Sequence, residues 1–262
     1  MNKKFIIFSL LIIILILILF IFNKNKNFDH FSKYNDKYFK DILNKKEKED
    51  LHIILKEIIT HLENQNIDYF FAFGSLIGAV RHGFRMPYDD DIDLIINDKD
   101  LDKFLKNLKI KKKKEKSTTY YLNNNVEIIH KNWGIPIKIV KKDNHYPFID
   151  INTYFKENNN IYVPKKQLVN GHIKSFNQNV NDIYPLKKAK FEEFKIKIPN
   201  KYIKILKNQY GKDVLNNCKI TYNHKKYCKN KNCENENASE HLYKEIKIKD
   251  LSSKYVNPKI YD

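Results

Sequence analysis

Arginine and glycine are scarce in this chain, and both are concentrated in one stretch. Only two of its 49 basic residues are arginines, Arg81 and Arg85. Both arginines and three of the six glycines fall within residues 70–96, which read FFAFGSLIGAVRHGFRMPYDDDIDLII. Elsewhere the composition is dominated by lysine, asparagine and isoleucine, as in a chain that has drifted with an AT-rich genome. We therefore expect the chemistry of the protein to lie in this stretch.

The scarcity of arginine also bears on the partner. A formal net charge of +18 permits attraction to nucleic acid, anionic lipid or phosphorylated glycan. Surfaces that bind nucleic acid typically cluster arginine with interleaved stacking aromatics, whereas the lysines here are spread along the whole chain. The sequence therefore predicts no nucleic-acid partner.

Charge is missing altogether from residues 5–22, FIIFSLLIIILILILFIF. As a helix this segment would be roughly 27 Å long, close to the thickness of a membrane's hydrocarbon core. A cleaved signal peptide has a shorter apolar region and a small-residue cleavage site, and neither is present. We predict an uncleaved transmembrane signal-anchor. Lysines flank it on both sides, so charge alone does not fix its orientation.

Cysteine is also rare, and all three cysteines lie in the C-terminal tail. With His224 between them, Cys218, Cys228 and Cys233 could supply four zinc ligands, although the spacing is not that of a standard finger. In an oxidising lumen a Cys228–Cys233 disulfide, leaving one odd thiol, is the expected alternative. Asn237 opens the one N-glycosylation sequon, Asn-Ala-Ser.

The concentrated stretch begins with an aromatic run of strand type at residues 69–73, broken by Gly74 and Ser75. Glycine lets the backbone turn sharply and lets a ligand approach closely. Residues 76–80 then form an apolar helical turn that should end at Gly83. Backbone N–H groups at the start of such a helix, together with the Ser75 hydroxyl, suit a phosphate.

Four carboxylates follow in the five positions from residue 89 to residue 93. In a strand, alternation places Asp91 and Asp93 on one face while Ile92 and Leu94 point to the core. Two carboxylates at such a short distance repel each other unless a cation lies between them. Mg²⁺ and Mn²⁺ are suitable cations because they prefer oxygen ligands. The pattern predicts a divalent metal site at Asp91 and Asp93. A solvated acidic loop entering an edge strand is the alternative.

Asp150 is the expected third carboxylate, from a neighbouring strand. It is a lone acid within the apolar run 147–152, PFIDIN. A buried, unpaired aspartate is unfavourable, and a metal beside it would remove the penalty. The alternative is an aspartate that caps a turn at a strand end.

The string GSLIGAVRHGFRMPYDDDIDL resembles the LicD family of the nucleotidyltransferase superfamily, which includes bacterial phosphocholine transferases and the fukutin-type enzymes of animals. The family pattern is Gly-(Ser/Thr)-Leu-Leu-Gly-Ala-x-Arg, followed by Pro-Trp, a run of aspartates, a hydrophobic residue and Asp. Tyr88 stands where the family has tryptophan. The matching residues are Gly74, Ser75, Gly78, Ala79, Arg81, Pro87, Asp91 and Asp93. A weaker likeness lies at 184–188, Pro199 and 209–211, so the resemblance covers roughly residues 50–215.

This resemblance implies an α/β (α+β) protein with the minimal nucleotidyltransferase fold, a mixed sheet with flanking helices. It implies transfer of a phospho-alcohol group, such as phosphocholine or ribitol phosphate, from a CDP-linked donor to a glycan. Asp91 and Asp93 would hold the metal, and Asp150 would complete the site and act as base on the acceptor hydroxyl.

The resemblance also places the donor phosphates at Gly74 and Ser75. Arg81 or Arg85 would neutralise the pyrophosphate, because a guanidinium forks onto phosphate oxygens better than an ammonium. Two alternatives remain open: another nucleotidyltransferase acting on a sugar, protein or RNA, and a catalytically inactive membrane-tethered scaffold.

The predicted organisation has five parts: a short tail at 1–4, the transmembrane anchor at 5–22, a stalk at 23–46, the catalytic domain at 47–215 and a cysteine-containing tail at 216–262. The glycan substrates of the family favour a single-pass type II membrane protein, with its catalytic domain in the ER or Golgi lumen or otherwise extracytoplasmic. Within the domain, periodicity predicts helices at 47–66, 100–109 and 199–210, and a solvated loop over the charge run 111–116.

Overall fold

The computed structural model describes residues 42–86, 89–131, 136–168 and 175–218, with two short strands at 246–247 and 260–261. The predicted membrane anchor and nearly all of the predicted stalk lie outside these residues. Among the residues that are described, no helix is long and apolar enough to cross a membrane.

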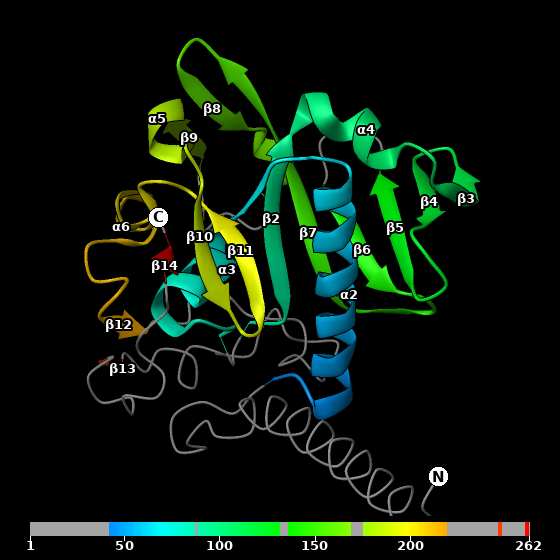
Figure 1. The fold of residues 1–262 in the computed structure, drawn as a ribbon, viewed down its shortest axis with the longest axis horizontal. Coiled ribbons are helices and arrows are strands. Elements are labelled where there is room, and N and C mark those ends of the chain that lie inside the picture. Colours follow the sequence, from blue (N-terminus) through cyan, green and yellow to red (C-terminus); the bar gives the residue numbers. More distant parts are fainter. Residues whose placement is uncertain are drawn as a thin grey trace, which may run out of the picture. The chain divides into compact units, whose positions relative to one another are not determined.

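The protein is a mixed α/β structure with a large mixed sheet and flanking helices (Figure 1). Its helices are α2 (Lys45–Asn64), α3 (Phe73–Ile77), α4 (Leu101–Leu105), α5 (Val180–Ile183) and α6 (Tyr202–Tyr210), with a π-helical turn at Gly78–His82 and 3-10 turns at Asp98–Asp100 and Lys165–Gln167. Its strands are β1 (Tyr69–Phe71), β2 (Asp91–Asn97), β3 (Lys109–Lys114), β4 (Ser117–Tyr121), β5 (Val126–Lys131), β6 (Ile137–Lys141), β7 (Asn144–Glu157), β8 (Asn160–Val163), β9 (Phe176–Asn179), β10 (Lys187–Phe191), β11 (Phe194–Ile198), β12 (Asn217–Cys218), β13 (Ile246–Lys247) and β14 (Ile260–Tyr261).

The large sheet has the strand order β1-β2-β7-β6-β5-β4-β3. β8 pairs with the C-terminal end of β7, and β9 pairs with β8. β2 and β7 run parallel, with Asp93 directly opposite Asp150, and the other pairs are antiparallel. The hairpin of β10 and β11 forms a second sheet with β14, and β12 pairs with β13. The parallel pair at the centre therefore brings together two segments that are far apart in sequence.

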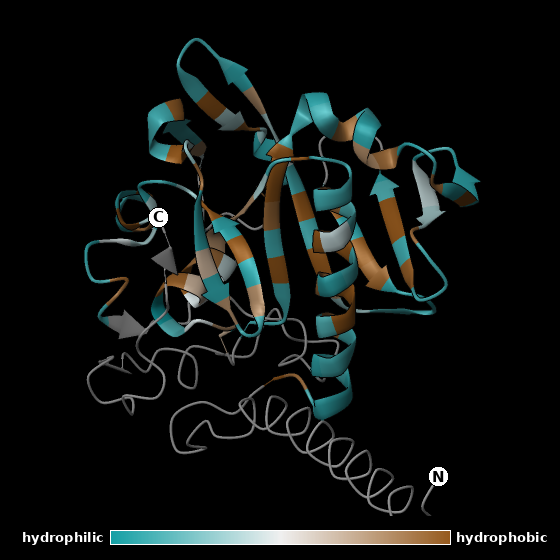
Figure 2. Ribbon diagram, viewed as in Figure 1, coloured by the Kyte–Doolittle hydropathy of each residue, from teal (hydrophilic) through white to brown (hydrophobic). Residues whose placement is uncertain are grey.

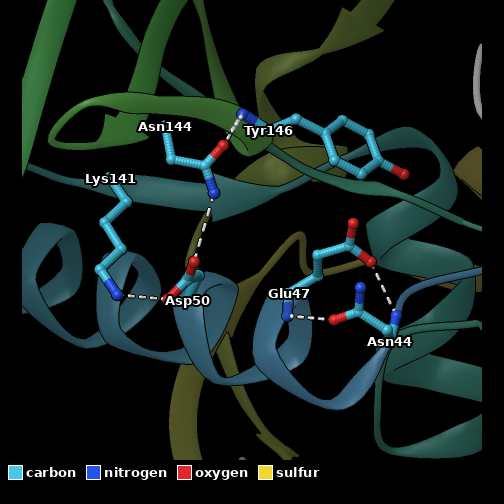
Figure 3. Close-up of polar contacts among 6 residues, drawn as sticks. All are labelled: Asn44, Glu47, Asp50, Lys141, Asn144 and Tyr146. Atoms are coloured by element: carbon cyan, nitrogen blue, oxygen red, sulfur yellow. Dashed lines mark hydrogen bonds and ion pairs between the residues drawn. The ribbon is translucent and has the colours of Figure 1, made fainter.

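Helix α2 covers one face of the large sheet over β6 and β7 (Figure 1). Asn44 caps its start: the Asn44 side chain accepts from the Glu47 amide, and the Glu47 carboxylate accepts from the Asn44 amide (Figure 3). The buried Asp50 binds Lys141 and Asn144 of the sheet (Figure 3). The helix predicted at 47–66 is confirmed, and it begins at Lys45 because of this cap.

The two faces of β2 and β7 differ, as strand alternation requires. Ile92 and Leu94 are buried on the face towards α2, and the strands behind that helix are largely apolar (Figure 2). On the other face, β2 carries Asp91 and Asp93 and then Ile95. Ile95 joins a buried aromatic and aliphatic cluster that includes Phe70, Tyr154, Phe176, Ile183 and Ile205. One face of the sheet therefore passes from carboxylates at one end to hydrophobic core at the other.

The charge run 111–116 is not the loop that the sequence predicts. It belongs largely to β3, an edge strand whose residues are all exposed. Lysine on an edge strand discourages pairing with other chains, so the charge is compatible with a strand. The predicted helix 100–109 is also too long: α4 ends at Leu105, and Asn107 has a left-handed backbone, with φ of 66°.

Candidate active site

The turn after β1 is fixed to the acidic strand by two hydrogen bonds. The Ala72 amide donates to the Asp93 carbonyl oxygen at 3.1 Å, and the Asp93 amide donates to Ser75 Oγ at 2.8 Å. Phe73, between them, has a left-handed backbone with φ of 49°. These contacts hold the start of α3 beside the start of β2. Gly74 and Ser75 thus lie next to the predicted metal ligands, although they belong to α3 itself and not to a turn before the helix.

Two glycines allow the segment before β2 to pack closely on this helical segment. We call this segment, which runs from Phe84 to Asp90, the acidic loop. A Cβ on Gly74 would lie 2.7 Å from Asp89 Oδ2, and a Cβ on Gly78 would lie 2.7 Å from the Phe84 carbonyl oxygen. Real Cβ atoms do not approach other atoms that closely. The glycines are therefore needed for close approach of the loop, rather than for an unusual backbone angle.

Both arginines are buried. The Arg81 guanidinium donates to the Val214 carbonyl oxygen and to His82 Nε2, each at 2.9 Å. The Arg85 guanidinium donates to the carbonyl oxygens of Met86, at 2.7 Å, and of Asp89. The structure thus places both predicted phosphate ligands in contact with the protein's own backbone, and Arg85 holds the segment from Met86 to Asp89 in place.

Three carboxylates form the tightest acidic group among the described residues. Asp89, Asp90 and Asp91 each offer a carboxylate oxygen within 4.8 Å of the others. Asp93 and Asp150 lie outside that group but next to it, on the paired strands β2 and β7. Alternation together with the register puts Asp91, Asp93 and Asp150 on the same face of the sheet.

Burial and mutual repulsion raise the pKa values of the aspartates in this arrangement. Burial raises the pKa of Asp89 to about 7, with the Asp93 charge adding to the shift and Arg85 opposing it. Burial and neighbouring carboxylates, Asp150 among them, also raise the pKa values of Asp91 and Asp93. A hard divalent cation would relieve this repulsion, and an all-oxygen donor set is the one that Mg²⁺ or Mn²⁺ prefers. The residues present therefore fit a metal of this kind.

Four residues to which the sequence analysis assigned no role in the site lie close to the carboxylates. Lys138 on β6 forms an ion pair with Asp150, its Nζ lying 3.2 Å from Oδ1. Phe148 and Tyr146 make an edge-to-face pair at the start of β7, with ring centroids 6.4 Å apart. Tyr210, at the end of α6, has its pKa raised by burial and by the charges of the nearby aspartates.

A signal for one of these residues was present in the sequence. Tyr210 lies in the Tyr-Gly segment that carries the weaker resemblance. Nothing distinguished Lys138 from the many other lysines, or Phe148 and Tyr146 from other strand aromatics.

Several predicted features fall outside the described residues. These are Pro87, Tyr88, the Cys228–Cys233 disulfide, the zinc ligands beyond Cys218 and the Asn237 sequon. Cys218 is placed only as the end of β12, paired with Ile246 of β13. The zinc, disulfide and glycosylation assignments stay predictions.

Comparison with known proteins now adds to this geometry. An uncharacterized protein of Rickettsia typhi is 36% identical over 58 residues, which are 22% of this chain and 19% of that protein. The chain thus aligns with about a fifth of that relative's length. A lincosamide antibiotic adenylyltransferase bound to lincomycin matches with a TM-score of 0.33 and 12% identity, over 62% of this chain and 94% of the other.

The family comparison covers the site itself. A family model described as LicD/FKTN/FKRP, nucleotidyltransferase domain, matches residues 66–201, more than half of the chain. The match runs from Asn66, three residues before β1, through the carboxylates of β2 and β7, to the residue before α6. The protein therefore belongs to the LicD family.

Proposed function

We propose that this protein is a metal-dependent phosphotransferase that moves a phospho-alcohol group from a CDP-linked donor to a glycan hydroxyl. Membership of the LicD family supports a transferase. The observation that carries the finer proposal is the pairing of Asp93 with Asp150 on parallel strands, beside the group of Asp89, Asp90 and Asp91. Such a set of carboxylates suits a divalent cation that is shared with a substrate's phosphates.

Asp91 and Asp93 would hold Mg²⁺ or Mn²⁺, with Asp150 completing the site and oxygens of Asp89 and Asp90 in reach of the same ion. When bound, the metal supplies positive charge that stabilises the donor pyrophosphate and the departing nucleotide. Gly74 and Ser75 lie at the same end of β2 and would line the donor side.

Asp150 would accept the proton of the acceptor hydroxyl. Burial raises the pKa of Asp150 above the usual value, although the Lys138 ion pair opposes this shift. A carboxylate with a raised pKa is a stronger base. The acceptor oxygen then forms a bond to the phosphorus of the alcohol phosphate, the bond to the bridging oxygen breaks, and CMP leaves.

Arg81 and Arg85 act mainly through the protein in this proposal. Arg85 holds the Asp89 carbonyl, and its charge lowers the pKa of Asp89. It therefore keeps the acidic loop in position and limits the repulsion there before metal and donor arrive.

The same proposal includes a membrane anchor at 5–22, with the catalytic domain at 47–215 facing the lumen or the outside of the cell. The uncharged apolar segment and the glycan acceptor support this arrangement. The acceptor would then be a glycan or glycoconjugate on the same side of the membrane.

The test is a calorimetric titration of the full chain in a mild non-ionic detergent. CDP-choline, CDP-ribitol, CDP-glycerol, CTP and ATP are each titrated with and without Mg²⁺. We expect metal-dependent binding of one CDP-alcohol, and its loss in Asp93→Asn. Asp98→Asn is the matched control, because Asp98 is exposed just beyond the other end of β2.

Each other result would overturn the proposal in its own way. If CTP or ATP binds and none of the CDP-alcohols binds, the protein is a different nucleotidyltransferase. No metal-dependent binding of any nucleotide would indicate a scaffold. An Asp150→Asn variant with full turnover would remove Asp150 from the role of base.

A further inference from the structure

Lys138 is held in an unusual position for a lysine. It lies on β6 directly opposite Asp150 of β7. Its Nζ lies 3.2 Å from Asp150 Oδ1 and 2.9 Å from the centroid of the Phe148 ring. Phe148 and Asp150 alternate on β7 and so point to the same face of the sheet. The ammonium group is thus restrained by an aromatic face and a carboxylate at once.

The side chain of Lys138 is not sealed in the core. It retains 30% of its exposure, and Asp150 retains 20%. The Lys138 ammonium can therefore be reached by a ligand entering from solvent. The Asp150 oxygen beside it, Oδ1, is buried, so a ligand would meet the remaining part of that carboxylate. Lysine also has a flexible stem, so its ammonium can move by a few ångströms without a change in the backbone.

Lys138 acts on the whole acidic site rather than on one partner. Its positive charge lowers the pKa values of Asp91, Asp93 and Asp150, against the burial that raises all three. Arg85 does the same for Asp89. In the free protein, Asp91, Asp93 and Asp150 thus share the Lys138 ammonium as a counter-charge.

We propose that Lys138 is a positioning residue for the donor, whose ammonium neutralises the carboxylates of the free site and moves onto a donor phosphate when metal and donor bind. This inference rests on the proposed function. A bound divalent cation would take over the carboxylates and repel the ammonium. A phosphate oxygen beside Asp150 would then accept hydrogen bonds from the Lys138 ammonium. This move would also release Asp150 from its ion pair, so that it could take the proton of the acceptor hydroxyl.

The proposal predicts opposite effects of one substitution on two ligands. Lys138→Gln removes a cation that competes with the metal, so Mn²⁺ alone should bind about three- to tenfold more tightly, within the tenfold that a one-unit pKa shift represents. The same variant loses a phosphate contact, so CDP in the presence of Mn²⁺ should bind about tenfold more weakly. A residue with a merely structural role would weaken both.

The experiment is calorimetry on the full chain in detergent, with Mn²⁺ alone and then CDP at saturating Mn²⁺. CDP is the probe because it is common to every donor considered. Lys113→Gln on the exposed strand β3 is the control for the change in net charge, and it should alter neither affinity. Lys138→Arg keeps the positive charge, so it should not tighten the binding of Mn²⁺ alone, although a guanidinium is not equivalent to an ammonium over an aromatic ring. Lys138→Met replaces Lys138→Gln if the polar variant does not fold.

The outcomes separate this inference from the proposed function. If the unsubstituted chain binds no CDP with Mn²⁺, the proposed function fails and this inference fails with it. If that chain binds CDP but Lys138→Gln shifts both affinities in the same direction, or neither of them, the inference about Lys138 alone is overturned.

Discussion

Gly74 shows how one missing Cβ controls the acidic site. In Gly74→Ala the new Cβ would lie 2.7 Å from Asp89 Oδ2, the far end of a side chain, so the carboxylate must move. Alanine favours a helix by about 1 kcal/mol over glycine, which offsets the local crowding. We expect the free energy of unfolding to change by less than about 1 kcal/mol, while Mn²⁺ binding in a calorimetric titration weakens about tenfold.

Gly78→Ala is the matched comparison, because its Cβ would meet a backbone atom, the Phe84 carbonyl oxygen, at the same distance of 2.7 Å. Backbone cannot move aside as a side chain can. Denaturant unfolding should therefore show a loss of about 1–3 kcal/mol. The interpretation fails if Gly74→Ala keeps its full affinity for Mn²⁺, or if Gly78→Ala is as stable as the unsubstituted chain.

Single residues also show which parts of the site a sequence can reveal. Alternation placed Asp91 and Asp93 on one face, and the structure confirms that Asp150 comes from the neighbouring strand, directly opposite Asp93. Lys138 could not be recognised, because its role depends on the register between β6 and β7. The sequence does single out Arg81, but not its contact with Val214, which joins residues far apart in the chain.

At the scale of elements, the hairpin of β10 and β11 is tied to α2 by a histidine. His52 Nε2 lies 3.0 Å from Glu193 Oε1, and its Nδ1 lies 3.6 Å from Glu192 Oε2. The Glu192 amide also donates to the Gly83 carbonyl oxygen at 2.6 Å. The hairpin thus connects α2 with the glycine that ends the π-helical turn beside the acidic loop.

This histidine makes the docking of α2 on the hairpin depend on pH. Burial lowers the pKa of His52, but Glu192 and Glu193 outweigh it and the net pKa lies above the usual 6.5. The ion pairs of His52 with Glu192 and Glu193 therefore stabilise the fold fully below about pH 6.5. This stabilisation is lost as the pH rises through the raised pKa of His52. His52→Gln should reduce the free energy of unfolding at pH 5.5 by under about 1 kcal/mol, because the pair is partly exposed, and by less at pH 9.

Denaturant unfolding at the two pH values gives the measurement. In a chain that already carries Glu192→Gln and Glu193→Gln, the effect of His52→Gln should no longer vary with pH. An effect of His52→Gln that is larger at pH 9 than at pH 5.5 would contradict the assignment.

Elements also divide the predictable from the unpredictable parts of the fold. Helix α2 was predicted closely from the helical spacing of its apolar residues, and the Asn44 cap, which the sequence analysis did not use, explains its earlier start. Strand β3 was missed because a run of lysines has no apolar alternation, and its strand state comes from pairing with β4. The parallel neighbours β2 and β7 are separated in the chain by α4 and β3 to β6, so their adjacency is a property of the sheet and not of either segment.

The whole molecule combines a basic exterior with an acidic site. The net charge of +18 creates a long-range field that favours an anionic donor, whereas the aspartates of β2 and β7 attract a cation locally. Without a metal, the aspartates oppose folding, because burial and mutual repulsion raise their pKa values. Under the proposed function, the free fold gives up some stability because these carboxylates are kept for a metal.

This trade-off gives a prediction for global stability. At pH 8 and without metal, Asp93→Asn should raise the free energy of unfolding by about 1–2 kcal/mol, since it removes one carboxylate from the repelling set. Mn²⁺ at about 100 times its Kd should stabilise the unsubstituted chain by about 2.7 kcal/mol. For a chain of this size, that corresponds to a rise in Tm of roughly 5–10 °C. In Asp93→Asn the metal should produce little or no rise.

Thermal unfolding of the full chain with and without Mn²⁺ makes the comparison, and Asp98→Asn serves as the control that should behave like the unsubstituted chain. If Asp93→Asn lowers Tm without metal and keeps the full rise with Mn²⁺, then Asp93 is a structural residue and the cation binds elsewhere. If the variant instead gains stability and loses the response, the same carboxylate both destabilises the free fold and binds the metal. That combination is expected of a residue retained for chemistry, because a residue retained only for packing would make the free fold more stable.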